Sequence, residues 1–176
     1  MAGLYERLGV DTSRLGCVML DCDVLDTRGH VADALWSDGV LPWGASASEP
    51  REEAHVTLLY GLLQPAPVWR DEIAEVLDGW TPPDVVTVSA FAVWPQDAYD
   101  CVVGLIRDAP DYQLTKAHDR LSKLPHINTY PYQPHVTIGY AMPGLGRYVV
   151  ADLERLQTVR PVMQLMTHGL NFGREE

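Results

Sequence analysis

The sequence predicts an α+β fold built by internal duplication, with two antiparallel sheets lining a central groove and helices on the outside. One observation behind this prediction is a His-Val-Thr triplet that occurs at positions 55–57 and again at 135–137, eighty residues apart. The other is that strand-like and helix-like segments follow one another in the same order around both triplets. The chain therefore divides into two related lobes of approximately residues 1–80 and 81–176.

The first half begins with a predicted strand at residues 16–24, which is apolar at first and then alternates. A short helix at residues 30–40 follows, and then a loop at residues 41–53 that is rich in Pro, charge and small side chains. This loop leads into the strand with the first triplet. Apolar residues at three- and four-residue steps predict an amphipathic helix at residues 67–80, and a third strand follows at residues 85–94.

The second half repeats this order. A strand at residues 101–106 is joined to the preceding strand by a hairpin-type connection, and a helix at residues 112–124 is ended by a proline. The strand with the second triplet comes next, followed by a short helix near residues 149–157 and a last strand at residues 161–171. We expect a single domain covering residues 1–176, in which strands can exchange between the lobes.

Composition predicts a soluble, cytoplasmic protein with a sizeable core. Hydrophobic residues make up 47% of the 176 residues, yet no apolar stretch reaches membrane-spanning length and the N-terminus lacks a signal peptide's apolar centre. The odd number of cysteines, without a Cys-x-x-Cys pair, indicates reduced and packed thiols at Cys17, Cys22 and Cys101.

The net charge of −11 bears on the binding partner. A protein that grips a long phosphate backbone needs a basic stripe, and this chain has only two lysines and scattered arginines. We therefore expect a small or cyclic nucleotide substrate enclosed in a pocket, with no long nucleic acid and no membrane as partner. The protein is expected to be a monomer or a weak homo-oligomer.

The two triplets carry the residues needed to split a phosphodiester. Positions i and i+2 of a strand share a face, so each triplet presents a His beside a Thr and turns its Val toward the core. Of two imidazoles near neutral pH, the neutral one takes a proton from the attacking oxygen and the protonated one supplies a proton to the leaving oxygen. Threonine hydroxyls donate hydrogen bonds to the phosphate oxygens. We predict four catalytic residues and no metal or cofactor: His55, Thr57, His135 and Thr137. The pattern leaves open which His is the acid.

Two H-x-T-apolar motifs on strands of a duplicated α+β chain resemble the 2H phosphoesterase superfamily. The second motif, Pro134 to Ile138 (PHVTI), is similar to that family's P-H-V-T-L form, and CVVGLI followed by an amphipathic helix matches its layout. The resemblance implies a bilobal, pseudo-two-fold fold with both motifs facing a central groove. It also implies a metal-independent phosphodiesterase of 2′,3′-cyclic phosphates, 2′-5′ linkages or cyclic nucleotides.

The sequence departs from part of this family at one position. Bacterial 2′-5′ RNA ligase-like members often place Arg five residues after the second His, where this chain has Tyr140, and Tyr60 is its counterpart in the first half. An odd offset turns each tyrosine away from the groove unless a bulge intervenes, so we expect both to pack in the core. The pattern is more similar to the viral anti-CBASS phosphodiesterases, which degrade cyclic oligonucleotide signals. This resemblance implies immune evasion by a virus in the host cytoplasm.

Substrate-binding candidates flank the two motif strands. Nucleotide bases stack on flat side chains, and four aromatic residues in or beside these segments can offer them: Trp36, Trp43, Tyr130 and Tyr132. Arg51, ahead of the first motif, and Arg147, after the second, are candidate phosphate clamps.

Other functions remain open at this point. The chain can instead be a 2′-5′ oligonucleotide or 2′,3′-cyclic phosphate phosphodiesterase of RNA metabolism, or a sponge that binds nucleotides without cleaving them. The run VMLDCDVLDT also resembles the opening of haloacid-dehalogenase phosphatases, with Asp21 as nucleophile, Asp23 as acid and Mg²⁺ bound. The downstream Lys and acidic-pair motifs of that class are missing in the expected order. A chelator separates this metal-dependent alternative from two-histidine catalysis.

Overall fold

The computed structural model describes residues 15–25, 54–159 and 163–172. The helix predicted at residues 30–40 and the loop at 41–53 lie outside these ranges. The first half contains strand β1 (Gly16–Leu25), strand β2 (Ala54–Leu62), a 3-10 helix η2 (Ala66–Trp69), helix α3 (Arg70–Val76) and strand β3 (Val85–Pro95). The second half contains strand β4 (Asp100–Ile106), helix α4 (Gln113–Leu121), strand β5 (His135–Ala141), helix α5 (Gly146–Val159) and strand β6 (Gln164–Asn171). The described elements follow the predicted order, and the α+β class is confirmed.

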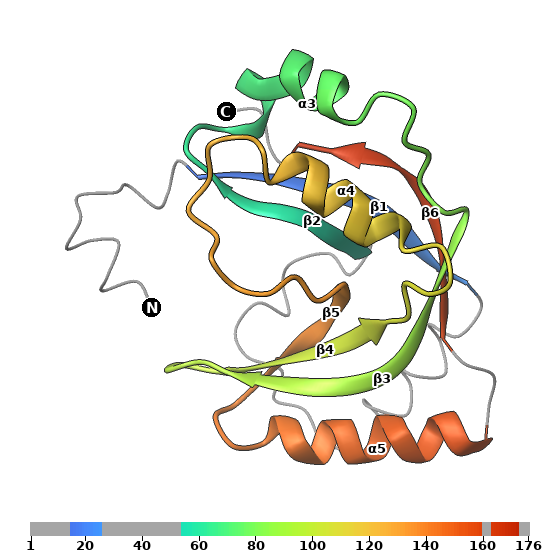
Figure 1. The fold of residues 1–176 in the computed structure, drawn as a ribbon. Helices are drawn as coiled ribbons and strands as arrows, with labels where there is room; N and C mark the ends of the chain where they lie inside the picture. The colour runs from blue at the N-terminus through green and yellow to red at the C-terminus, as the bar shows by residue number, and fades with distance from the viewer. Residues whose placement is uncertain (1–14, 26–53, 160–162, 173–176) are drawn as a thin grey trace.

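The strands form one closed sheet in the order β1-β2-β5-β4-β3-β6, and neighbouring strands run antiparallel (Figure 1). The sequence predicted two sheets, and the structure differs from this prediction. Pairing between β2 and β5 at Val56 and Val136 joins the two halves on one side. Pairing between β3 and β6 joins them on the other. Backbone hydrogen bonds across both junctions make the sheet continuous.

The two halves exchange their third strands. β6, from the second half, pairs with β1, whereas β3, from the first half, pairs with β4. The relation is symmetrical, because β1, β2 and β3 occupy the same places in the closed sheet as β4, β5 and β6. This exchange leaves the two motif strands, β2 and β5, as direct neighbours.

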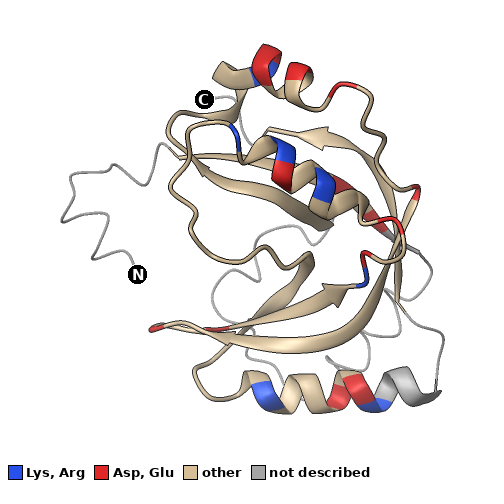
Figure 2. Ribbon diagram, viewed as in Figure 1, with Lys and Arg blue, Asp and Glu red and all other residues tan. Residues whose placement is uncertain are grey.

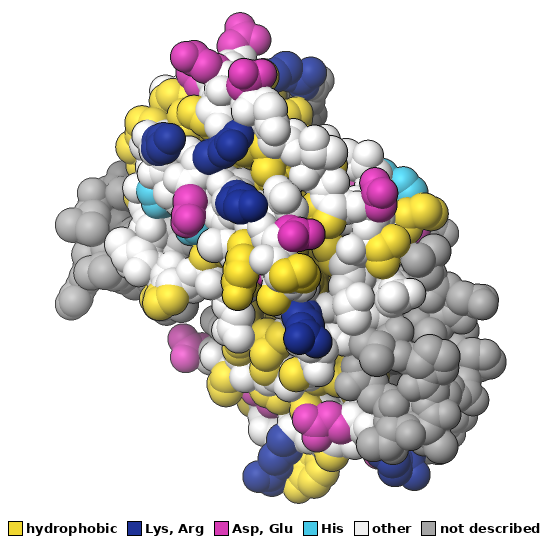
Figure 3. Space-filling view, turned by 45° about the vertical axis from the view of Figure 1, so that its right-hand side comes forward, with side chains coloured by type: hydrophobic (Ala, Val, Ile, Leu, Met, Phe, Trp, Pro, Cys, Tyr) yellow, Lys and Arg dark blue, Asp and Glu magenta, His cyan; other side chains and the backbone are white. Residues whose placement is uncertain are grey.

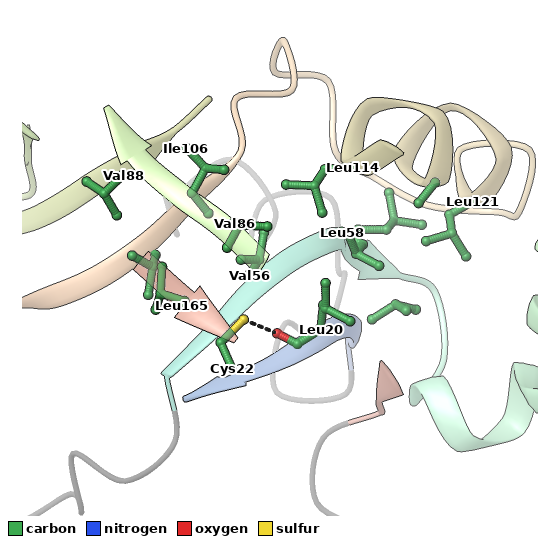
Figure 4. Packing of buried hydrophobic residues seen from close by; sticks show 14 of the residues in the cluster. Leu20, Cys22, Val56, Leu58, Val86, Val88, Ile106, Leu114, Leu121 and Leu165 are labelled. Carbon is green, nitrogen blue, oxygen red and sulfur yellow. Dashed lines mark hydrogen bonds between the residues drawn. The ribbon is translucent and has the colours of Figure 1, made fainter. Parts of the chain in front are cut away.

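One hydrophobic cluster fills the space between the sheet and its helices. Alternate residues of β1, among them Leu20 and Cys22, are buried, and the Cys22 thiol donates to the Leu20 carbonyl at 3.4 Å (Figure 4). Leu114 and Leu121 of α4 face the same cluster. Burying one such leucine contributes about 1.5–3 kcal/mol.

Helix α5 packs against β3, β4 and β5 through Val149 and Leu153, both of which are buried (Figure 1). Its first residue, Gly146, lies so close to β3 that a Cβ there would sit 2.8 Å from the Val93 side chain. The buried Asp100 carboxylate accepts the Gly146 backbone N–H at 2.9 Å and fixes this approach. Helix α5 is thereby held on the core side of the second motif strand.

Both motif strands contain a β-bulge immediately after the triplet. Val18 and Met19 of β1 pair with Leu59 and Thr57, so β2 has one extra residue between them, Leu58. In the second half, Val102 and Val103 of β4 pair with Gly139 and Thr137, so the extra residue of β5 is Ile138. A bulge bends its strand and shifts the side-chain alternation by one residue.

Helix α4 supports the first bulge. The Asp108 carboxylate accepts the backbone N–H groups of Leu114 and Thr115 at 2.9 and 2.7 Å, which anchors the helix start. One turn further on, the His118 ring places Nδ1 at 2.8 Å from the carbonyl oxygen of Leu58, the extra residue of β2. Because this carbonyl can only accept, Nδ1 carries the proton. The bulge is thus stabilised by a hydrogen bond from outside the sheet.

None of the helices in the described ranges is both long and apolar enough to cross a membrane.

Candidate active site

The two triplets meet across the β2–β5 pair. Val56 is the antiparallel partner of Val136, and both valines point into the core. Antiparallel order therefore sets His55 beside Thr137 and Thr57 beside His135, on the opposite face of the sheet. Directly opposed side chains in such a pair have Cβ atoms about 4.5–5.5 Å apart. We call the face that carries these four half-buried side chains the shared face.

The two imidazoles interact electrostatically. Burial lowers the pKa of His135, a hydrogen bond to the Gln133 carbonyl opposes this change, and the positive charge of His55 lowers the pKa further. His135 Nδ1 lies 2.9 Å from the Gln133 oxygen, which can only accept, so the proton sits on Nδ1. In the neutral ring the lone pair is then on Nε2.

Trp94 lies against His135. Its ring meets the imidazole edge-on, with centroids 4.3 Å apart. The register of β3 pairs Trp94 with Cys101, which places the indole on the shared face. Sequence analysis missed this residue, because alternation within β3 does not reveal which strand becomes its neighbour.

The cross-strand neighbours of the two histidines differ. Asp21 of β1 is the partner of His55, whereas Leu105 of β4 is the partner of His135. Both carboxylate oxygens of Asp21 accept hydrogen bonds from Asn171 Nδ2, at 3.0 and 3.1 Å. A protonated His55 would therefore have an oriented carboxylate beside it.

Each motif threonine lies beside a cysteine. Thr57 hydrogen-bonds with Cys17 of β1, and Thr137 hydrogen-bonds with Cys101 of β4. Burial raises the pKa of the Cys17 thiol to about 11 and raises that of Cys101 as well. Both sulfurs are therefore thiols near neutral pH. Each threonine hydrogen bond lowers the pKa of its cysteine, as a threonine O–H that donates to sulfur does.

The structure overturns the predicted core position of the two tyrosines. Cys17 pairs with Tyr60 and Cys101 pairs with Tyr140, so each tyrosine lies on the same face as the cysteine of its half. The bulges are the reason, because they convert an odd offset from the His into a place on the shared face. Tyr60 is 51% exposed, and the half-buried Tyr140 meets the Tyr99 ring edge-on with centroids 5.0 Å apart.

Two of the other aromatic candidates lie in described parts of the chain. Tyr132 stacks on His118 with centroids 4.1 Å apart, and its hydroxyl donates to the Thr57 carbonyl at 3.2 Å. One face of its ring is therefore covered, and the residue acts as a packing group behind β2. Tyr130 is 55% exposed on the loop before β5. The candidates Trp36, Trp43 and Arg51 lie outside the described residues.

Arg147 was predicted as a phosphate clamp, and the structure places it elsewhere. It belongs to the first turn of α5, which covers the core side of the sheet rather than the shared face. Its Nη2 donates to the Tyr148 hydroxyl at 2.9 Å, and its guanidinium lies 4.8 Å from the centre of that ring.

Both aspartates of the phosphatase-like motif interact with side chains of strand β6. Asp21 is bonded to Asn171, and Asp23 pairs with His168 Nε2 at 2.7 Å. In the described ranges, His, Cys, Asp and Glu side chains do not gather in groups of three or more that could hold a metal ion. This arrangement does not fit the predicted roles of Asp21 as nucleophile and Asp23 as acid around Mg²⁺.

Charged side chains lie mainly on helices and loops (Figure 2). The six described strands contain neither Lys nor Arg, and their acidic residues are Asp21, Asp23 and Asp100. On the face drawn in Figure 3, the basic groups of the described residues are dispersed among acidic and apolar ones. Donors to a phosphate on these strands are therefore imidazoles and uncharged groups such as the threonine hydroxyls.

Facing His-x-Thr strands define a phosphoesterase of the two-histidine class. A family model described as the 2′-5′ RNA ligase superfamily matches residues 44–163, which is more than half of the chain. The chain belongs to this superfamily, and it is a phosphodiesterase of the 2H type. The resemblance predicted from the two motifs is confirmed.

Solved structures show the same fold. Usb1 from Kluyveromyces marxianus matches with a TM-score of 0.62 and 13% sequence identity, over 90% of this chain and 93% of that one. The structure of the same Usb1 with uridine monophosphate matches with a TM-score of 0.62, 14% identity and the same coverage. At this identity the likeness establishes the fold alone. No curated protein matches the chain at the level of sequence.

Proposed function

We propose that this protein cleaves small nucleotide phosphodiesters by metal-independent acid–base catalysis with His55 and His135. The observation that carries the proposal is the antiparallel pairing at Val56 and Val136, which sets each histidine beside the threonine of the other motif. Two titratable groups and two hydroxyl donors then surround one position on the shared face. A phosphate bound there is within reach of an acid, a base and neutral donors.

His135 acts as the base in this proposal. Its lowered pKa keeps the ring neutral at pH 7, and the bond from Nδ1 to Gln133 leaves the Nε2 lone pair to accept a proton. Nε2 removes the proton of a water or of the ribose 2′-hydroxyl as that oxygen bonds to phosphorus. The bond from phosphorus to the leaving oxygen breaks in the same displacement.

His55 acts as the acid. Protonated, it gives its proton to the leaving oxygen, and the Asp21 carboxylate is its cross-strand neighbour before that transfer. After one displacement His135 holds a proton and His55 lacks one. Exchange with solvent, or hydrolysis of a cyclic phosphate intermediate by the reverse roles, returns both rings to their starting states.

Thr57 and Thr137 stabilise the negative charge that builds up on the non-bridging oxygens. Their hydroxyls lie across the strand pair from the two imidazoles and hydrogen-bond with the cysteine thiols. With neither Lys nor Arg in the strands and a net charge of −11, the protein favours a substrate that brings few charges. A single enclosed phosphodiester meets this condition better than a long nucleic acid does.

Within this class we propose cyclic oligonucleotide signals as the substrate, cleaved in the cytoplasm of a virus-infected host. The support is the His-Val-Thr-apolar-apolar-Tyr pattern and its similarity to the anti-CBASS phosphodiesterases. A 2′-5′ oligonucleotide or 2′,3′-cyclic phosphate substrate of RNA metabolism is the second candidate. It is favoured by the family description and by the structural likeness to a Usb1 that was solved with uridine monophosphate.

The test incubates the purified protein with four substrates: a cyclic dinucleotide, a cyclic trinucleotide, a 2′-5′ dinucleotide and a mononucleoside 2′,3′-cyclic phosphate. Each reaction is run with and without EDTA, and the products are separated by chromatography. We expect turnover that EDTA leaves unchanged and that the His55→Ala and His135→Ala variants lose. Activity that EDTA abolishes, or binding without product, contradicts the proposal and supports the phosphatase or the sponge instead.

A further inference from the structure

We propose that Tyr60 and Tyr140 are two base-stacking platforms, so that the preferred substrate carries a nucleobase on each side of the scissile phosphodiester. This inference rests on the proposed function, because it names the substrate class of the same site. It selects linkages between two nucleosides over terminal 2′,3′-cyclic phosphates.

A β-bulge in each motif strand places its tyrosine on the shared face. An undisturbed strand would turn both tyrosines into the core, but the extra residues Leu58 and Ile138 return them to the shared face. Both halves contain the extra residue at the same distance from the triplet. The regular pairing of the strand is therefore interrupted in both halves, and each interruption places a tyrosine on the shared face.

The two tyrosines lie at matching positions along their strands. Tyr60 lies three register positions beyond Val56, measured on β1, and Tyr140 lies three beyond Val136, measured on β4. Three positions correspond to about 10 Å. Because β2 and β5 run antiparallel, the tyrosines are displaced in opposite directions, with the His and Thr side chains between them.

This spacing selects a splayed substrate. Stacked neighbouring bases are only about 3.4 Å apart, too close to reach both platforms at once. Two bases turned away from each other, with the phosphate between them, can each meet one tyrosine. The site would therefore hold an unstacked pair of nucleosides and exclude a base-paired duplex.

Aromatic stacking gives this site a source of affinity for the substrate that needs no charge. The strands provide neither Lys nor Arg, so lysine and arginine ion pairs with the substrate cannot come from them. Stacking on an aromatic ring is independent of charge and tolerates any base. Tyr60 is 51% exposed, and the Tyr99 ring holds Tyr140 from the side through an edge-on contact. Both rings are supported on strands rather than on loops.

The experiment compares Tyr60→Leu and Tyr140→Leu with the unaltered protein on two kinds of substrate. One kind carries two bases, as a linear 3′-5′, a linear 2′-5′ or a cyclic dinucleotide, and the other is a mononucleoside 2′,3′-cyclic phosphate. We expect each leucine variant to lose about tenfold in kcat/KM on the dinucleotides and less than threefold on the one-base substrate. Phenylalanine at either position should retain the activity.

A matched control is Tyr148→Leu, since Tyr148 is 52% exposed on α5 and belongs to the core side of the sheet. It should leave both substrates unaffected. Thermal melting establishes that each variant is folded, and the phenylalanine variants separate stacking from packing if a leucine variant melts early. Equal losses on one-base and two-base substrates, or no loss on either, overturn the inference.

A binding measurement makes the inference independent of turnover. Calorimetry measures the affinity of a dinucleotide for the inactive His135→Ala variant and for double variants that also carry Tyr60→Leu or Tyr140→Leu. The single variant should bind about tenfold more tightly than either double variant. Unchanged affinity overturns the platforms even if the protein is inactive. Absence of turnover in the unaltered protein refutes the proposed function, whereas turnover without a tyrosine effect refutes only the inference.

Discussion

The strand pair β1–β2 and its counterpart β4–β5 share their main structural features but differ in the residue that lies opposite the motif histidine. In each pair a bulge follows the triplet, a cysteine hydrogen-bonds with the motif threonine, and a tyrosine joins the shared face. The residue opposite the histidine differs, being Asp21 in the first pair and Leu105 in the second. The two strand pairs share a backbone plan, while one cross-strand position gives the two histidines different neighbours.

The surroundings of His135 extend the difference. Trp94 lies against its ring at 4.3 Å, and burial lowers its pKa, whereas His55 has a carboxylate for a neighbour. A symmetrical site would give two equivalent imidazoles with no preferred direction of proton transfer. In the proposed mechanism the asymmetry supplies that direction. The following changes test how far the two halves differ.

The largest effect is expected from removing either imidazole. Replacing His55 or His135 by Ala should lower kcat by about 10²–10⁴-fold, because each proton transfer contributes a factor of this size. The double variant should lose less than the product of the two factors, since the histidines act on the same displacement. Steady-state kinetics on the best dinucleotide measures this.

His168→Ala serves as the control, because His168 is a half-exposed histidine of β6 that pairs with Asp23. It should alter kcat by less than twofold. Near-normal turnover in His55→Ala or His135→Ala would remove the two-histidine mechanism.

The next largest effect tests the carboxylate of the first half. Asp21→Asn should lower kcat at pH 7 about tenfold, because it removes the negative charge that lies opposite a protonated His55 across the β1–β2 pair. Asp23→Asn, two residues further along β1, is the matched control and should leave kcat unchanged. If both variants behave alike, Asp21 does not distinguish the halves.

A smaller, pH-dependent effect tests the second half. The base must be neutral, so activity rises with pH through the pKa of His135, and the midpoint lies below the ordinary value of 6.5. Trp94→Leu admits water and should move this midpoint upward toward 6.5. The rate should therefore fall severalfold near pH 5.5 and change little above pH 8. A midpoint that stays in place shows that Trp94 does not bury the base.

The same shift links His135 to stability. Its pKa is lowered on folding, so its contribution to stability is complete above about pH 6.5 and is lost as pH falls through the folded-state value. In Trp94→Leu the melting temperature should depend less on pH between 6.5 and 5 than in the unaltered protein. Thermal melts across this range measure it.

The smallest effect is expected at the cysteines that the two halves share. Cys17→Ala or Cys101→Ala should slow turnover about twofold to threefold, because each removes only a weak sulfur hydrogen-bond partner beside a threonine. The two losses should be similar if this part of the duplication is symmetrical. Cys22→Ala is the contrasting control, since it should cost about 1 kcal/mol of stability and leave kcat unchanged.

Much of the fold and the centre of the site could be predicted from local patterns. Alternation and helical periodicity indicated the described strands and helices, and the repeated triplet indicated His55, Thr57, His135 and Thr137. The predicted order of elements followed because periodicity depends on neighbours in sequence. These features need no knowledge of which strands pair.

The failures share one cause, which is pairing between distant strands. The bulges that bring Tyr60 and Tyr140 to the shared face are visible only when β2 and β5 are aligned with β1 and β4. The local sequence around Asp21 resembled a phosphatase motif. Its actual neighbour across the strand pair, His55, is thirty-four residues away in sequence and is revealed only by the register. Trp94 was missed for the same reason.

By itself the sequence determined the candidate catalytic residues and the strands that carry them, since side-chain alternation is a local property. The tertiary structure decided which residues meet: one closed sheet in place of two, two bulges, and an acidic neighbour for one histidine but not for the other. Register is set by the burial of whole faces and by hydrogen bonds between remote strands. No short window of sequence contains those contacts.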